Sequence, residues 1–262
     1  MIEPYEKCLW GGSAKGRKGM RRFFIEGSCQ VGDQLTLKET DSKHFAHVLR
    51  GRVGDELEIV CDGRVFVALV IEVQRTVTVR LLRQVEEYSE APLELYLLQG
   101  IAKGERMDLV IQKAVELGVK AIIPVMFSRC VVRLTGEKAL EKQKRWQKIA
   151  ESAAKQCGRQ QVPEILPVAA PAEALDCLPP GASLILPWEE AEEKTLGSVL
   201  SAEAPAVAAV MIGPEGGLTR EEVARARARG AQVVTLGRRI LRTETAAISV
   251  VAIVMHRWGD LG

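Results

Sequence analysis

The sequence has no long apolar run and no cysteine pair at metal-binding spacing. No stretch reaches the roughly 18 uninterrupted apolar residues that a membrane-spanning helix needs, and the N-terminal MIEPYEKCLW lacks the basic-then-apolar pattern of a signal peptide. The six cysteines are scattered without a CxxC pair, which argues against a zinc site and a disulfide framework and favours free thiols. We therefore predict a cytoplasmic protein with no membrane segment and no metal.

Two common nucleotide-binding motifs are also missing. The glycine-rich stretch MIGPEGGLTREE, residues 211–222, matches neither G-x-x-x-x-G-K-[ST] nor G-x-G-x-x-G. Neither a phosphate-binding P-loop nor a dinucleotide-binding fold is therefore indicated. The sequence also contains no internal repeat of solenoid period and no low-complexity tract.

The chain has 262 residues and is 47% hydrophobic, which is enough for one large globular domain or two ordinary ones. Its net charge of +2 hides an uneven distribution. Residues 103–159 carry 13 basic against 6 acidic side chains, whereas residues 160–219 carry 1 against 9. A basic segment is typical either of a surface that binds a polyanion such as nucleic acid or of a solvated helix face.

Residues 21–90 consist mainly of short strand-like runs, which predicts a small β-barrel-like domain. The dipeptide Asp62-Gly63 between two apolar runs predicts a hairpin. One helix is expected to begin after Asp41, as its cap, and to end at Gly51. Residues 1–20, rich in glycine and lysine, are expected to form a flexible leader.

From residue 91 to residue 262 the pattern changes to alternating strands and helices. A strand over 93–101, an amphipathic helix over 106–118 and a buried strand over 121–127 form a βαβ unit, which requires parallel pairing. A long helix is predicted over 137–157, and further short strands over 166–170, 184–187, 206–212 and 232–237. The fold class is therefore α/β.

The glycine-rich stretch joins one of these strands to a helix. Thr219 and Glu222 have the spacing of a capping box, which marks the start of that helix. The three glycines either let backbone amides approach a ligand or merely satisfy a tight turn. A second irregular loop, LGRRILRTETAA, follows the next strand. Because ligands of open α/β sheets bind beyond the carboxyl ends of strands, we predict one pocket shared by both loops.

Four stretches, IQKAVELGVKAIIPV, KQCGRQQVPEI, GPEGGLTREE and LGRRILRTETAA, resemble in this order the RsmE-type ribosomal RNA small subunit methyltransferases of the SPOUT superfamily. RRFFIEG and HFAHVLRGRVGDELEIVCDG extend the resemblance over nearly the whole chain. It implies methylation of N3 of a uracil in the 16S ribosomal RNA of the 30S subunit, with S-adenosyl-L-methionine as methyl donor. It also implies a homodimer, a SPOUT-type parallel sheet with a C-terminal trefoil knot over residues 91–262, and a PUA-like RNA-binding β-barrel over residues 21–90.

The resemblance further implies which residues bind the cofactor. They are Leu186, Ile212, Gly213, Pro214, Glu215, Gly217, Leu236, Gly237, Ile240, Leu241 and Thr243. Backbone groups are expected to bind adenine and ribose, while Ile240 and Leu241 pack on the ring. Glu215 either faces the ligand or accepts from the amides of its own loop. The sequence departs from the family at Ser128, where glutamate is usual, so any role of that carboxylate is absent here.

Uracil N3 carries a proton at neutral pH and must lose it before it attacks a methyl group. Positive charge near the uracil oxygens stabilises the resulting anion. We expect Arg242 to supply that charge, Glu244 to act as the base or as an orienting group, and Arg22 to reach the site from the barrel. A purely structural role is also open for Glu244, since an acidic residue in the first turn of a helix complements the helix dipole.

N3 lies on the Watson–Crick edge, so the target base must be unpaired or flipped out when it reacts. Phosphate contacts to the RNA are expected from the barrel and from the basic helix, namely from Arg21, Arg22, Arg50 and Arg52 and from Lys142, Lys144, Arg145, Lys148, Lys155 and Arg159. His44 and His47 have no third ligand nearby in the sequence, which favours a structural or RNA-facing role over a metal site.

Two other classes of protein stay open at this stage. One is a non-catalytic RNA-binding or ribosome-assembly factor that retains a cofactor loop, and the other is an α/β enzyme that acts on a nucleotide. The apolar final helix, AISVVAIVMHRW, fits either a dimer interface or core packing against the sheet.

Overall fold

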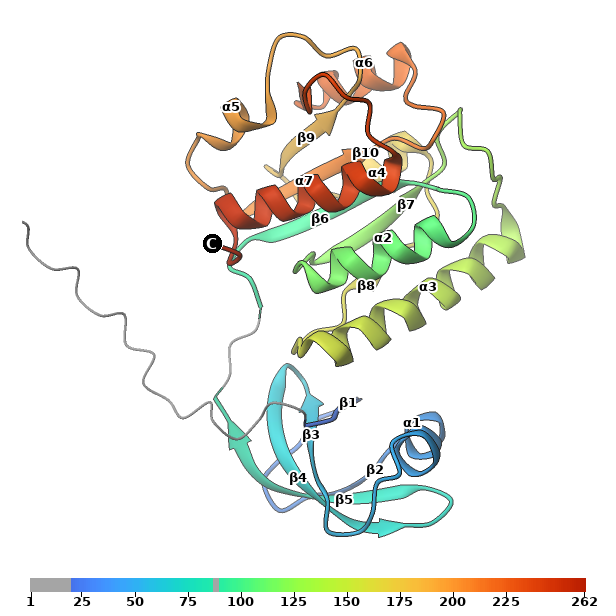
Figure 1. Cartoon of the computed structure of the whole chain (residues 1–262), viewed down its shortest axis with the longest axis vertical. Helices are drawn as coiled ribbons and strands as arrows, with labels where there is room; N and C mark the ends of the chain where they lie inside the picture. Colours follow the sequence, from blue (N-terminus) through green and yellow to red (C-terminus); the bar gives the residue numbers. More distant parts are fainter. Residues whose placement is uncertain (1–19, 87–89) are drawn as a thin grey trace, which may run out of the picture. The chain divides into compact units, whose positions relative to one another are not determined.

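The structure is a computed structural model that describes residues 20–86 and 90–262 (Figure 1). The chain divides into two compact units, Met1–Glu87 and Tyr88–Gly262, called here the N-terminal unit and the C-terminal unit. Apart from residue 20, the predicted leader over residues 1–20 lies outside the described residues.

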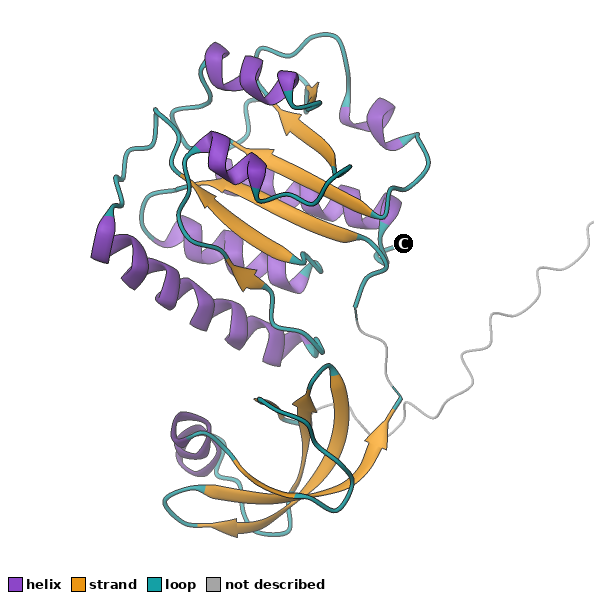
Figure 2. Cartoon of the chain, turned by 180° about the vertical axis from the view of Figure 1, so that it is seen from behind, coloured by secondary structure: helices purple, strands orange, loops and turns teal. Residues whose placement is uncertain are grey.

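The N-terminal unit is a curled five-stranded sheet (Figures 1 and 2). Its strands, in spatial order, are β1 (Arg22–Ile25), β3 (Glu56–Cys61), β4 (Arg64–Val73), β5 (Val77–Val85) and β2 (Gln34–Thr36). β1 pairs with β3 in parallel, and the other three pairings are antiparallel. The curl encloses one main hydrophobic core.

The predicted hairpin at Asp62-Gly63 is confirmed. These two residues connect the antiparallel strands β3 and β4, and both have positive φ, 49° for Asp62 and 69° for Gly63. Two positive φ angles in a two-residue loop match the right-handed twist of the strands it joins. Asp and Gly adopt such angles at little cost, which is why the dipeptide could be recognised in the sequence.

The helix of the N-terminal unit begins earlier than predicted. α1 (Glu39–Lys43) starts at Glu39, so Asp41 lies inside the helix and does not cap it, and the wider π-helical turn η1 (His44–Val48) continues it. Leu37 still pairs with β5, because its backbone N–H donates to the carbonyl oxygen of Val77. The chain therefore turns into the helix directly after this strand contact, before Asp41 is reached.

The prediction of free cysteines is wrong for one pair, since a disulfide links Cys29 and Cys61. Both cysteines are fully buried in the core of the N-terminal unit. They are 32 residues apart, and the curled sheet brings their Cα atoms to 6.2 Å. No short sequence spacing signals a pair that only the tertiary fold brings together. Cys130, Cys157 and Cys177 are free.

The C-terminal unit is built on a six-stranded sheet in which every pairing between strands is parallel. In spatial order the strands are β11 (Gln232–Val234), β9 (Ser183–Pro187), β10 (Val207–Ile212), β6 (Glu94–Gly100), β7 (Ala121–Val125) and β8 (Glu164–Ile165). The predicted βαβ unit and the α/β fold class are confirmed. The strand predicted over 166–170 is replaced by the shorter strand β8, which ends just before this range. Within the range, Ala169 forms only an isolated bridge with Val125.

Helices cover both faces of this sheet (Figures 1 and 2). They are α2 (Glu105–Glu116), α3 (Gly136–Cys157), α4 (Pro171–Asp176), α5 (Leu196–Leu200), α6 (Arg220–Ala228) and α7 (Thr243–Trp258). α2 and α7 pack side by side on one face, α3 packs against α2 and β8, and α4 lies on the opposite face. In the described part of the chain, no helix combines the length and the apolar character needed to cross a bilayer.

Helix α2 shows why the sequence pattern predicted these elements correctly. Met107, Val110, Ile111 and Ala114 recur at helical spacing and are all buried. Gly118 follows the helix with φ of 97°, the left-handed conformation that ends many helices.

Candidate functional site

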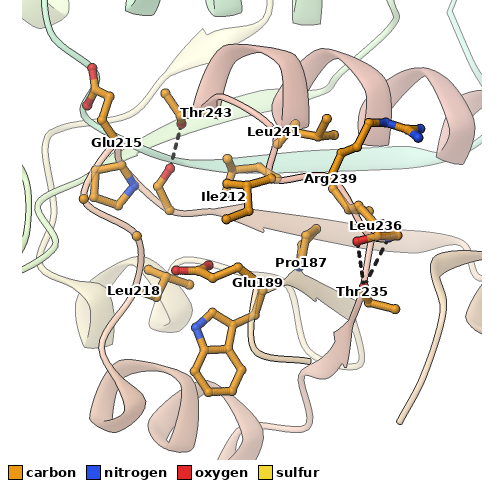
Figure 3. Close-up of a pocket in the computed structure, with 18 of the residues that line it drawn as sticks. Pro187, Glu189, Ile212, Glu215, Leu218, Thr235, Leu236, Arg239, Leu241 and Thr243 are labelled. Carbon is orange, nitrogen blue, oxygen red and sulfur yellow. Dashed lines mark hydrogen bonds between the residues drawn. The ribbon is translucent and has the colours of Figure 1, made fainter. Parts of the chain in front are cut away.

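A cavity of about 240 Å³ lies where three neighbouring parallel strands end (Figure 3). These strands, β11, β9 and β10, are adjacent in the sheet although other elements separate them along the chain. The cavity is lined by residues 187–189 from the end of β9 onward, 212–218 from the end of β10 onward and 235–241 after β11, together with Thr243 and Ala246 of α7. The predicted shared pocket of the two loops is therefore present, at the sheet edge where α/β proteins bind ligands.

The glycines of the loop after β10 are needed for close contact as well as for turning. A β-carbon on Gly216 would lie 2.8 Å from the backbone oxygen of Arg129. Gly217 has φ of 71°, and a β-carbon there would lie 2.5 Å from Oε1 of Glu189. Arg129 also holds the loop, because its Nη1 donates to the carbonyl oxygens of Gly216 and Leu218 at 3.3 Å. The glycines are therefore needed for a tight turn that packs closely on the protein's own atoms, and approach to a ligand stays a prediction.

Ser128 contributes to the same region through its backbone and not through its side chain. Its N–H donates to Oε1 of Glu222 at 2.8 Å. Oε2 of Glu222 accepts from the N–H of Thr219, which completes the predicted capping box. Helix α6 is thereby fastened to the loop after β7.

Thr243 joins the two cavity loops and β6 by hydrogen bonds. Its hydroxyl donates to the carbonyl oxygen of Gly213 at 2.6 Å and accepts from Nε2 of Gln99 at 3.0 Å (Figure 3 shows the first of these). Gln99 is fully buried and Thr243 is 6% exposed, so water does not compete for these bonds. The hydroxyl fixes the start of α7 against the glycine loop.

Thr243→Val is expected to lower the free energy of unfolding by about 1–3 kcal/mol, because it leaves the partly buried carbonyl of Gly213 without its donor. Thr243→Ser keeps the hydroxyl and is the matched control. Urea unfolding of the two variants and the wild type measures the effect. A loss of stability in Thr243→Ser with none in Thr243→Val would show that the methyl group, and not the hydroxyl, matters.

Glu215 lines the cavity, and its carboxylate is bound by the segment that connects β6 to α2. Oε1 of Glu215 accepts from the backbone N–H of Lys103 and from Nη1 of Arg106, both at 2.9 Å. Partial burial raises the pKa of the Glu215 carboxyl, but these hydrogen bonds and the charge of Arg106 lower it more, so its pKa lies below the ordinary value. Nε of Arg106 also lies 3.8 Å from Oε1 of Glu244, so one guanidinium bridges two carboxylates.

The lowered pKa of Glu215 predicts a pH-dependent contribution to stability. Since its folded pKa is below the unfolded value, the contribution is complete above the unfolded pKa of about 4.3 and is lost as pH falls through the folded pKa. Thermal unfolding of Glu215→Gln should therefore occur at a lower temperature than that of the wild type at pH 7, with the difference shrinking below about pH 4. Glu203→Gln, at an exposed carboxylate of the same unit, is the control. A constant difference at all pH values would contradict the assignment.

All of the residues predicted to bind the cofactor line this cavity except Leu186. Leu186 is fully buried within β9, and the lining begins at the next residue, Pro187. Ile240 is 87% exposed on the loop after β11. Several lining residues were missed in the sequence: Trp188, Glu189, Leu218, Thr235 and Ala246. Each lies within three positions of a predicted residue, so extending each predicted loop by a few positions would have found them.

The two catalytic candidates of the C-terminal unit lie beside the cavity. Arg242 is exposed and is the N-cap residue of α7, between the lining residues Leu241 and Thr243. The side chain of Glu244 is 13% exposed and faces Arg106. Its Oε2 is buried and has no hydrogen-bond partner among the described residues. This placement favours an orienting role for Glu244 over a role as a base inside the cavity.

Two predicted functional arginines are buried in ion pairs, contrary to the roles proposed for them. Nε and Nη2 of Arg22 donate to Oε2 of Glu58 at 2.9 and 2.7 Å, and its side chain is 5% exposed. Arg159 is 5% exposed, pairs with Glu90 and donates to the carbonyls of Val115 and Val119. These guanidinium groups are therefore held inside their own units, where loss of the paired carboxylate would leave a costly unpaired charge.

The other predicted RNA-binding residues lie at the surface to different degrees. Arg50 and Arg52 are exposed, and Arg50 has φ of 53°. Arg21 is half-buried and donates to the carbonyl of Leu49 at 2.9 Å. Lys155 is partly buried and pairs with Glu151 on α3.

His44 and His47 are both exposed on the helical segment of the N-terminal unit. Within residues 20–86 and 90–262, no three His, Cys, Asp or Glu side chains come together in a way that could hold a metal ion.

Comparison with known proteins gives consistent matches over nearly the whole chain. A family model described as RNA methyltransferase domain matches residues 89–255. The ribosomal RNA small subunit methyltransferase E of Bacillus subtilis (strain 168) is 32% identical over 250 residues, which cover 91% of this chain and 97% of that protein.

Solved structures agree in fold. The ribosomal RNA small subunit methyltransferase E of Neisseria gonorrhoeae, bound to S-adenosyl methionine, superimposes with a TM-score of 0.85 at 36% identity, over 93% of this chain and all of that one. A putative methyltransferase from Legionella pneumophila in complex with the same cofactor gives a TM-score of 0.86 at 36% identity and the same coverage.

Proposed function

Because the chain belongs to the RNA methyltransferase family that includes ribosomal RNA small subunit methyltransferase E, we propose that it transfers a methyl group from S-adenosylmethionine to a base of small-subunit ribosomal RNA. The base is a uridine of the 16S RNA in the 30S subunit, and the methylated atom is N3. The protein acts in the cytoplasm.

One observation carries this proposal: the cavity at the ends of β11, β9 and β10. Its loops include positions without a side chain, Gly213, Gly216, Gly217 and Gly237, and it has apolar side chains from Ile212 and Leu241 beside them. Backbone that a ligand can approach closely and apolar surface suit a nucleoside, so the residues present fit the cofactor. When bound, S-adenosylmethionine supplies an activated methyl group on its sulfonium.

The chain's own residues then have to orient the uracil and remove its proton. Methyl transfer is an in-line displacement, so most of the catalysis comes from alignment. We propose that Arg242, exposed next to the cavity, stabilises the negative charge that forms on the uracil oxygens as N3 loses its proton. Arg106 holds Glu215 and Glu244 in place beside it.

Titration calorimetry distinguishes this function from the two alternatives. The full chain is expected to bind S-adenosylmethionine and to show no comparable heat with ATP. An enzyme that acts on nucleotides would show the opposite preference. Binding of S-adenosylmethionine without any methyl transfer to ribosomal RNA would favour an assembly factor that retains the cofactor loops.

The N-terminal unit is proposed to be a PUA-like barrel that contacts the RNA. Its curled sheet and the exposed Arg50 and Arg52 support this role. Contacts of arginine with phosphates position a nucleic acid without reading its sequence.

We also propose a trefoil knot in the C-terminal unit. β11 lies at the edge of the sheet beyond β9, yet the helix that follows it, α7, packs against β10 and β6 near the middle. The intervening segment therefore crosses back over the strand ends, as a knotted path requires. Chains rarely thread through their own loops, so membership of the family is the main support.

A homodimer is proposed as well, formed through the outer face of α7. Ile253 of α7 is a large apolar residue that stays 45% exposed. An exposed apolar residue on an otherwise apolar helix is typical of a surface that a partner covers.

A further inference from the structure

A groove of about 660 Å³ runs between α2 and α3, outside the cavity described above. α2 contributes Asp108, Leu109 and Gln112, and α3 contributes Ile149 and Ser152. Ile149 and Ser152 also line a second hollow along α3, so the two depressions form one continuous channel, called here the α2–α3 groove. The two helices pack side by side (Figure 1).

The outer rim of the groove is basic. Lys144, Arg145 and Lys148 of α3 are exposed along the second hollow, against a single acid there, Glu141. This turn of α3 lies in the segment that carries 13 basic and 6 acidic side chains. A row of exposed cations along a channel is the arrangement that follows a phosphate backbone.

The floor of the groove carries a carboxylate and apolar side chains, in contrast to the basic rim. One carboxylate oxygen of Asp108 pairs with Arg145, while Oδ1 is buried and has no hydrogen-bond partner in the described part of the chain. A buried acceptor without a donor is uncommon and suits a ligand that brings one, such as a ribose 2′-hydroxyl or a base amino group. Leu109, 40% exposed, and Ile149 provide apolar surface beside it for the face of a base.

One residue links the groove to the cofactor cavity. Arg106 lines the groove, and its Nη1 binds Glu215, which lines the cavity. The two hollows therefore lie on either side of this ion pair. The basic segment noted in the sequence thus has a defined place next to the site of methyl transfer.

We propose that the α2–α3 groove binds the single-stranded RNA that adjoins the target uridine. The phosphates lie along Lys144 and Lys148, and the riboses and bases face Asp108 and Leu109. This proposal rests on the function proposed above, because it names where that RNA substrate lies.

The test measures binding of a fluorescently labelled, uridine-containing single-stranded RNA to the full chain at several salt concentrations. Each lost phosphate contact on a single strand reduces the slope of log K against log salt by about 0.7. Lys144→Ala/Lys148→Ala should therefore lower the slope by about 1.4, weaken binding roughly tenfold at low salt and leave the affinity for S-adenosylmethionine unchanged. Arg225→Ala/Arg227→Ala on α6, at two exposed cations of the same unit, is the matched control and should change neither value.

A second variant, Ser152→Trp, fills the groove without changing its charge. It should weaken RNA binding while the salt slope stays that of the wild type. The proposal would be overturned by an unchanged salt slope in the lysine variant. An equal loss of RNA affinity in the α6 control would overturn it as well. A change of oligomeric state in Ser152→Trp with unaltered RNA affinity would also overturn it, since the groove would then hold a second copy of the chain. Absence of methyl transfer by the wild type would instead contradict the proposed function, so the two failures are distinguishable.

Discussion

Gly100→Ala is expected to weaken the binding of S-adenosylmethionine by up to about hundredfold. Gly100 is the last residue of β6, and a β-carbon there would lie 2.5 Å from the backbone nitrogen of Pro214 and 2.8 Å from the carbonyl carbon of Gly213. Both are backbone atoms of the cavity wall, so no side-chain rotation relieves the clash. Overpacking of this kind costs about 1–3 kcal/mol of stability, and here the strain falls on the cofactor loop.

Calorimetry with S-adenosylmethionine and thermal unfolding together measure this effect. Gly197→Ala is the control, because its β-carbon would meet only Oγ1 of Thr195, at 4.0 Å, and because alanine favours the short helix α5 that contains it. The control should bind the cofactor as the wild type does. Normal affinity in Gly100→Ala would show that the loop can move without cost and is not held as described.

Arg242→Ala is expected to lower kcat for methyl transfer by about 10²–10³-fold, the usual effect of removing one group that stabilises a developing oxyanion. Arg242 is the exposed N-cap residue of α7, so the variant should fold normally. Its affinity for S-adenosylmethionine should be unchanged, since Arg242 itself does not line the cavity. Single-turnover methylation of small ribosomal subunits, with cofactor affinity measured separately, separates the two effects.

Arg257→Ala is the matched control, since Arg257 is an exposed arginine at the opposite end of the same helix. It should methylate at the wild-type rate. If Arg242→Ala also does so, the catalytic role of Arg242 is excluded. A loss of cofactor affinity equal to the loss of rate would instead make Arg242 part of the cofactor site.

Local patterns in the sequence predicted much of the fold. The spacing of Met107, Val110 and Ile111 marked the buried face of α2, and Asp62-Gly63 marked the β3–β4 hairpin. These signals depend on neighbours along the chain, where backbone preference and hydrophobic period act together. The glycine loops were found in the same way, because strand, loop and helix follow one another directly.

Contacts between distant residues could not be predicted in this way. Arginine is the residue type expected on an RNA-binding surface. Arg22 and Arg159 are nevertheless buried, each against a carboxylate that is distant in the sequence: Glu58 for Arg22 and Glu90 for Arg159. The roles of Arg106 and Gln99 at the cavity were missed for the same reason. Such pairs form because the fold places buried charges and amides where only a matched partner offsets their desolvation.

The most direct test of the proposed function is to identify the methylated nucleoside. Small ribosomal subunits from cells that lack the enzyme would be incubated with the purified chain and isotopically labelled S-adenosylmethionine, and the RNA would be digested to nucleosides for mass spectrometry. We predict that the label appears in a single nucleoside, 3-methyluridine. Absence of label, or label on another base or on the ribose, would contradict the account.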